Sequence, residues 1–108
     1  MATTAAFHHP SREDIRLVDV MHALGHPIRM QIVCELVNGE ETSCGAIDVD
    51  VPKSTLTSHW RILREAGVIY QRPEGRKVNL TLRRDDLDAR FPGLLALIFS
   101  KDAPAPNP

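Results

Sequence analysis

The segment KSTLTSHWRILREAG, residues 53 to 67, combines hydroxyl, imidazole and guanidinium groups that can serve as nucleophile, base or phosphate ligand. Ser58 next to His59 raises the question of nucleophilic catalysis, which requires the imidazole to reach the hydroxyl. Neighbouring residues of a helix point about 100° apart, and no third group is placed to orient the imidazole. The chain also lacks a glycine-rich phosphate loop and a prominent pair of acids. These observations indicate that the protein is not an enzyme.

The two faces of this expected helix differ in a way that suits binding. Leu56, Trp60 and Leu63 fall within about 60° of one another and predict the face that packs on the core. The opposite face carries Ser54, Ser58, Arg61 and Glu65, flanked by Thr57 and Arg64. Ser and Thr hydroxyls bond phosphates or base edges, and arginine grips guanine through two bonds. A well-capped helix that only faces water has the same composition, so this face alone leaves both interpretations open.

The charge is distributed unevenly along the 108 residues, although the formal net charge is only −1. Residues 53–84 carry a net charge of +6, whereas residues 1–52 carry −5 and residues 85–108 carry −2. A contiguous basic region matters more for phosphate binding than the total charge does. The basic middle third is therefore the candidate for contact with nucleic acid.

Apolar periodicity, capping residues and breakers predict five or six helices. The expected helices span residues 12–24, 27–37, 43–47, 54–66 and 85–99, the last of them interrupted at Pro92 and Gly93. Ser11 with Asp14 forms a weak capping box for the first helix, and Pro27 suits the first turn of the second. Ser54 is a natural N-cap for the fourth helix, and Gly67 suits the position just after its end.

Two short segments rich in strand formers follow the fourth helix. Residues 68–72 and 78–82 predict a β-hairpin, because a Pro-Glu-Gly turn separates them. The tip and flanks of this hairpin carry Arg72, Arg76 and Lys77. Helices followed by a basic hairpin predict a mainly α fold with a small β-hairpin (α+β), namely a winged helix-turn-helix with a two-stranded wing.

The runs ALGHPIRMQIVCELVNGE, SCGAI, KSTLTSHWRILREAGVI and RPEGRKVNLTL together resemble the ArsR/SmtB family of small bacterial winged-helix repressors. The resemblance covers about residues 15 to 99, and its most specific part is KSTLTSHWRILREAGVI. It implies a homodimeric, sequence-specific DNA-binding regulator, usually a repressor. Its recognition helix, residues 54–66, would enter the major groove of a two-fold symmetric operator while the wing contacts the flanking backbone.

The residues expected to contact DNA lie on the recognition helix and the wing. They are Lys53, Ser54, Thr55, Thr57, Ser58, His59, Arg61, Arg64, Arg72, Arg76 and Lys77. His59 lies beside the core face of the helix, so packing is its alternative role.

The resemblance also implies that the first and last helices pack across a dimer axis. The apolar residues expected at this interface are Ile15, Val18, Leu94, Leu95 and Ile98, with ordinary core packing as the alternative. The expected organisation is a flexible arm (1–10), a winged helix-turn-helix DNA-binding and dimerisation domain (11–99) and a disordered tail (100–108).

An effector site is not predicted by the resemblance. Many members of the family bind metal through paired cysteines before the recognition helix, or through Asp and His on the last helix. Here TSCGAI offers only Cys44, and DDLDARFPGLLALIF contains no histidine. Other residues whose side chains suit nickel, zinc or copper are His8, His9, His22, His26, Cys34 and Cys44. Solvated histidines and free thiols are the alternative, as is a thiol switch that pairs Cys34 and Cys44 across a dimer.

The composition narrows the remaining alternatives. No apolar run approaches the roughly 20 residues that cross a bilayer, and the N-terminus does not resemble a secretory signal, so we expect a cytoplasmic protein with no membrane partner. A winged helix used only for protein contacts tends to lose the cations that this chain keeps. DNA is therefore the expected partner, with an effector metal or a partner protein as further possibilities.

Overall fold

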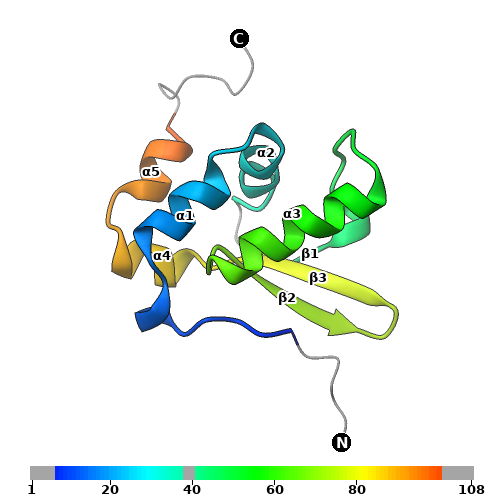
Figure 1. Cartoon of the computed structure of the whole chain (residues 1–108), viewed down its shortest axis with the longest axis horizontal. Coiled ribbons are helices and arrows are strands. Elements are labelled where there is room, and N and C mark those ends of the chain that lie inside the picture. Colours follow the sequence, from blue (N-terminus) through cyan, green and yellow to red (C-terminus); the bar gives the residue numbers. More distant parts are fainter. Residues whose placement is uncertain (1–6, 38–40, 101–108) are drawn as a thin grey trace, which may run out of the picture.

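The computed structural model describes residues 7–37 and 41–100. The described elements are η1 (Arg12–Asp14), α1 (Leu17–Leu24), α2 (Pro27–Glu35), β1 (Thr42–Ser43), η2 (Cys44–Ala46), α3 (Lys53–Glu65), β2 (Ile69–Glu74), β3 (Lys77–Leu82), α4 (Arg84–Arg90) and α5 (Leu94–Ile98). Helices α1, α2 and α3 cover one side of the sheet, while α4 and α5 lie at the end opposite the hairpin turn (Figure 1). The predicted winged helix-turn-helix architecture is confirmed.

The wing is an antiparallel sheet in the order β1-β3-β2, so it has one strand more than the predicted hairpin. Strands β2 and β3 pair from Ile69 with Leu82 to Glu74 with Lys77, which leaves a two-residue turn. Gly75 begins this turn with φ 62°, a conformation that tight hairpins require and that glycine adopts without strain. Strand β1 is only two residues long, and periodicity does not reveal so short a strand.

The core lies where the three covering helices meet the sheet. Its fully buried side chains come from nearly every element and include Val20, Ile32, Val33, Leu63, Leu80, Leu87 and Leu95. Trp60 and Leu63 of α3 point into it, as the helical pattern predicts. The opposite face of α3 is consequently left to the solvent.

The prediction of one continuous helix over residues 12–24 is wrong. A single 3₁₀ turn, η1, is followed by extended backbone at Ile15 and Arg16 before α1 begins. The break drives Ile15 into the core, where it is 1% exposed. Gly67 lies directly beneath it with φ 86°, and a Cβ there would come within 2.5 Å of the Ile15 Cγ1. Gly67 is therefore required both by its backbone conformation and by this contact.

Two further helix predictions need correction. Pro52, not Ser54, is the N-cap of α3, and no side chain of the described residues caps this helix. The expected third helix shrinks to the 3₁₀ turn η2, although the Ser43 hydroxyl does accept a hydrogen bond from the Gly45 N–H at 3.3 Å. The predicted interruption of the last helix at Pro92 and Gly93 is confirmed, since α4 ends at Arg90 and α5 begins at Leu94. The expected stop of the second helix, Asn38-Gly39, falls outside the described residues.

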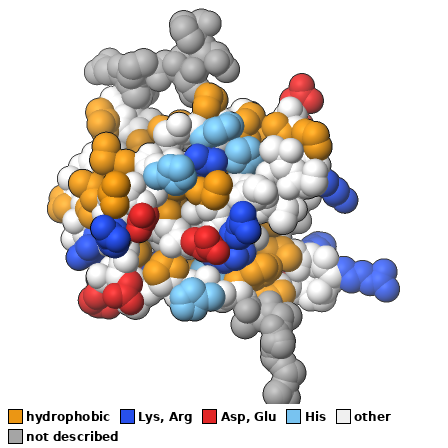
Figure 2. Space-filling model, in the orientation of Figure 1, with side chains coloured by type: hydrophobic (Ala, Val, Ile, Leu, Met, Phe, Trp, Pro, Cys, Tyr) orange, Lys and Arg blue, Asp and Glu red, His pale blue; other side chains and the backbone are white. Residues whose placement is uncertain are grey.

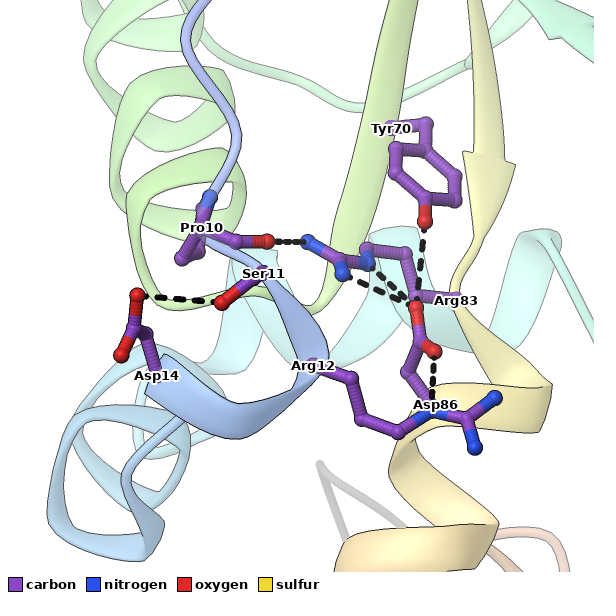
Figure 3. Close-up of polar contacts among 7 residues, drawn as sticks. All are labelled: Pro10, Ser11, Arg12, Asp14, Tyr70, Arg83 and Asp86. Carbon is purple, nitrogen blue, oxygen red and sulfur yellow. Dashed lines mark hydrogen bonds and ion pairs between the residues drawn. The ribbon is translucent and has the colours of Figure 1, made fainter.

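The segment before α1 is fastened to the wing and to α4 (Figure 3). The buried Arg83 donates to the Pro10 carbonyl at 2.8 Å and to Asp86 at 2.9 Å. Asp86 also accepts from Arg12 at 2.7 Å and from the Tyr70 hydroxyl at 3.1 Å. Residues 7–10 of the expected arm thus pack against the domain, whereas residues 1–6, like residues 101–108 of the expected tail, lie outside the described residues.

No helix in the described part of the chain has the length and apolar character needed to traverse a bilayer.

Candidate nucleic-acid interface

Helix α3 presents one continuous polar face. Its 13 residues extend over about 20 Å, enough to follow the major groove over several base pairs. The predicted DNA contacts that are exposed on this face are Lys53, Ser54, Thr55, Thr57, Ser58 and Arg61, and an exposed acid, Glu65, lies beside them at the end of the helix. The Thr57 hydroxyl donates to the Lys53 carbonyl at 3.0 Å and keeps its oxygen available as an acceptor. Six of the eleven residues expected to contact DNA are therefore accessible on one helix.

A groove of about 580 Å³ separates α3 from the wing. Lys53, Arg61 and Arg64 line it from the helix, and Arg76 and Lys77 line it from the hairpin. No carboxylate lines this groove within residues 7–37 and 41–100. Basic side chains project on the side where α3 begins and the hairpin turns (Figures 1 and 2). The folding of the chain thus brings cations that are 23 residues apart in sequence, such as Lys53 and Arg76, to one anion-binding surface.

The basic residues of the middle third divide into two groups. In the described part of the chain, no ion pair or side-chain hydrogen bond engages Lys53, Arg61, Arg76 or Lys77. Because these four side chains are exposed and their charge is not neutralised by a neighbour, they are available to phosphates. We call them the free cations.

The other predicted cations, Arg64 and Arg72, are engaged within the fold. Arg72 makes two hydrogen bonds of 2.6 Å to the Glu41 carboxylate. Those bonds raise the pKa of Arg72 and lower that of Glu41, as expected for a tight pair. Arg64 donates to the Gln71 side chain at 2.6 Å and its guanidinium lies 4.9 Å from the centre of the Phe7 ring. These two arginines hold the helix, wing and N-terminal segment together.

The prediction that His59 contacts DNA needs correction. Its side chain is buried, 6% exposed, on the reverse of the polar face. There its Nδ1 lies 3.2 Å from the Arg29 guanidinium, and its ring centre is 4.7 Å from that of His26. Arg29 was not among the predicted site residues, and its position between Ile28 and Met30 in an apolar stretch was the signal in the sequence that pointed to it.

An apolar surface lies over α1 and α5, at the end away from the wing (Figure 2). Val18 was expected there and is 60% exposed, while Leu94 and Ile98 are half-buried. Ile15 and Leu95 need correction, because each is 1% exposed and belongs to the core of the single chain. The exposed apolar residues that the sequence analysis missed are Leu17, Met21 and Leu97.

The candidate metal ligands are dispersed. His9 accepts a hydrogen bond from the Gln71 N–H at 2.9 Å, and His26 accepts one from the Ile28 N–H at 3.1 Å, so each imidazole already uses one nitrogen within the fold. His8, His22 and Cys34 are exposed, and Cys44 lies half-buried in the groove. Within residues 7–37 and 41–100, no three His, Cys, Asp or Glu side chains converge as a metal would require. The described residues of a single chain therefore do not assemble a nickel, zinc or copper site.

The two thiols are separate from each other and not activated. Burial is the main cause that raises the pKa of both thiols, and the neighbouring Glu35 raises that of Cys34 further. A raised pKa disfavours the nucleophilic thiolate at neutral pH. Both cysteines are free in the structure.

Known proteins resemble this chain in sequence. A helix-turn-helix domain family matches residues 24–72, from the end of α1 into β2. YceK of Bacillus subtilis (strain 168), an uncharacterised HTH-type transcriptional regulator, is 34% identical over 88 residues, which cover 79% of this chain and 87% of that protein. A biofilm growth-associated repressor of Agrobacterium fabrum (strain C58) is 30% identical over 85 residues, 77% of this chain and 72% of that protein.

Two solved structures share the fold. HlyU from Vibrio cholerae N16961 superposes with a TM-score of 0.60 and 29% identity, over 68% of this chain and 80% of that chain. The transcriptional repressor BigR from Xylella fastidiosa superposes with a TM-score of 0.57 and 26% identity, over 76% of this chain and 97% of that chain. Sequence, fold and the exposed polar helix agree, and the chain belongs to the winged-helix, DNA-binding transcriptional regulators of the ArsR/SmtB family, which are not enzymes.

Proposed function

We propose that the protein is a homodimeric repressor that inserts α3 into the major groove of its operator and contacts the flanking phosphates through the wing. The observation that supports this proposal best is the groove between α3 and the hairpin, which contains the free cations (Lys53, Arg61, Arg76 and Lys77) and which no carboxylate of the described residues lines. Phosphate contacts position a protein on the duplex, and base contacts give it specificity. In this proposal Arg76 and Lys77 position the domain, while Arg61 and the α3 hydroxyls contact base edges.

The exposed apolar side chains of α1 and α5 support a dimer. Val18 and Met21 are each 60% exposed and Leu97 is 66% exposed, which is unfavourable for apolar groups that stay in water. A second copy packed on this surface would bury them on both chains at once. Residues 11–99 would then form one DNA-binding and dimerisation domain, acting in the cytoplasm on an operator with two-fold symmetry.

Binding to DNA selected from a random-sequence pool tests the proposal. Fluorescence anisotropy should show a duplex that binds the protein much more tightly than a shuffled duplex of the same composition. Arg61→Ala should weaken binding to the selected duplex by about 1 to 3 kcal/mol, the range for one arginine contact to a base. Arg16→Ala is the matched control, because Arg16 is exposed but lies outside the groove.

Two results would contradict the proposal. The first is failure of the wild-type protein to enrich any duplex from the pool. The second is an Arg61→Ala variant that binds the selected duplex as tightly as the Arg16→Ala control does.

A further inference from the structure

A buried arginine connects three helices behind the polar face of α3. The Arg29 side chain, on α2, is 6% exposed. Its Nε donates to the Ala23 carbonyl at 2.6 Å and its Nη2 donates to the His22 carbonyl at 3.2 Å. Its Nη1 lies 3.2 Å from the Nδ1 of His59, on α3.

The first two bonds fix Arg29 to the end of α1. His22 and Ala23 lie in the last turn of that helix, where the dipole favours a cation, and the His22 carbonyl also accepts from the Gly25 N–H at 3.3 Å. Burial lowers the pKa of Arg29, but a guanidinium stays protonated at neutral pH. The guanidinium is therefore held in place against the end of α1, and its Nη1 points toward His59 of α3.

The third bond requires a particular form of His59. An arginine can only donate, so the Nδ1 of His59 must accept and the ring must carry its proton on Nε2. Burial lowers the pKa of His59, and the nearby His26 and Arg29 lower it further, which favours this neutral ring. Among the described residues, the titratable and charged groups that interact with His59 are Arg29 from α2 and His26 from the turn before it.

The position of His59 within α3 gives this bond a consequence for DNA. His59 lies directly between Ser58 and the Trp60–Arg61 pair, so any rotation of α3 that moves the histidine also moves the polar face. A helix with side chains has a radius of about 5 to 6 Å, and a rotation of about 10° therefore shifts its side-chain ends by about 1 Å. Hydrogen bonds to bases are lost over such a shift, whereas the attraction to a phosphate falls off slowly with distance.

We propose that Arg29 is a positioning residue for sequence recognition: it sets the rotation of α3 by bonding His59 while it is fixed to the end of α1. This inference rests on the proposed function, because it assumes that α3 reads the bases. A role in stability alone would lower the active fraction of the protein and so weaken selected and shuffled duplexes alike. A role in positioning lowers the ratio between the two affinities.

The test measures that ratio for the full chain by anisotropy, with the selected and shuffled duplexes described above. His59→Leu removes the acceptor and keeps an apolar side chain of similar length, whereas His59→Asn keeps an acceptor oxygen near the position of Nδ1. Arg29→Met removes the guanidinium that donates to His59. Val33→Ala is the matched control, since Val33 is fully buried on the same helix and its truncation destabilises the fold without touching the bond.

We expect His59→Leu and Arg29→Met each to lower the ratio at least about tenfold, because a turned α3 loses a contact to a base. The double variant that combines His59→Leu with Arg29→Met should lower the ratio by no more than about as much as either single variant does. The ratios of His59→Asn and Val33→Ala should stay within about twofold of the wild-type ratio. If Arg29→Met does not fold, the comparison of His59→Leu with His59→Asn still decides. An unchanged ratio in His59→Leu, or an equal loss in Val33→Ala or His59→Asn, overturns the inference while the proposed function stands. A wild-type protein that prefers no duplex overturns both.

Discussion

Replacing Arg76 and Lys77 by alanine should halve the salt dependence of DNA binding. Four cations per chain, Lys53, Arg61, Arg76 and Lys77, line the groove without an ion pair in the described residues. On a shuffled duplex, which lacks the base that Arg61 would contact in the operator, all four can face phosphates, so a dimer would offer about eight. Each phosphate that is neutralised adds about −0.9 to the slope of log K against log salt. The wild-type slope is then about −7, and the variant, which keeps about four of these contacts, should show about −3.6.

These slopes translate into a large difference over an accessible range. Between 50 and 200 mM salt, the wild-type affinity should fall about 10⁴-fold and the variant affinity only about 10²-fold. Anisotropy titrations of the shuffled duplex at four salt concentrations measure both slopes, because phosphate contacts do not depend on sequence. At low salt the variant should bind every duplex more weakly than the wild type does.

The control uses a wing arginine that the structure shows to be paired. Arg72→Ala combined with Glu41→Ala removes one cation and the carboxylate that neutralises it at 2.6 Å, so the net charge of the wing is unchanged. This double variant should keep a slope close to that of the wild type. The reasoning is refuted if the Arg76 and Lys77 variant keeps the wild-type slope, or if the paired control loses as much.

Three further outcomes follow from the packing. Gly67→Ala should lower the free energy of unfolding by about 2 to 4 kcal/mol in urea titrations, because alanine is strained at φ 86° and its Cβ would clash with Ile15; a loss under about 0.5 kcal/mol would contradict this. Met21→Glu should shift the dimer towards monomer in light scattering, whereas an unchanged mass would move the interface elsewhere. Burial raises the pKa of Asp86, but hydrogen bonds from Arg12, Arg83 and Tyr70 outweigh it and leave that pKa below its ordinary value. The wild type should therefore lose stability as pH falls below about 4, through the folded pKa, and Asp86→Asn should show a flatter urea midpoint across that range.

Local pattern was sufficient to predict the helix that carries the candidate interface. Leu56, Trp60 and Leu63 recur at helical spacing, and Trp60 and Leu63 are indeed buried. The strand propensities after Gly67 likewise predicted the hairpin. These elements are set by neighbours within a few residues of one another, so a single sequence contains most of the information that specifies them.

Long-range contacts explain what the pattern could not predict. The first helix breaks at Ile15 because that side chain is buried over Gly67, which lies 52 residues further on. Strand β1 exists only because Thr42 and Ser43 pair with Leu80 and Asn79. Neither contact leaves a local signal, and in both cases tertiary packing outweighs the intrinsic preference of the segment.

The cations of the basic middle third fall into two groups, those engaged within the fold and those available to DNA. Arg72 and Arg83 are paired with Glu41 and Asp86, which lie 31 residues and three residues away, so the net charge of +6 overstates what DNA can meet. The engaged arginines hold the wing and the N-terminal segment in place, and their loss should affect stability first. The free cations make no such bonds with residues 7–37 and 41–100, and their loss should affect the salt dependence of binding first. A substitution that changes both properties to the same extent would mean that this division does not hold in solution.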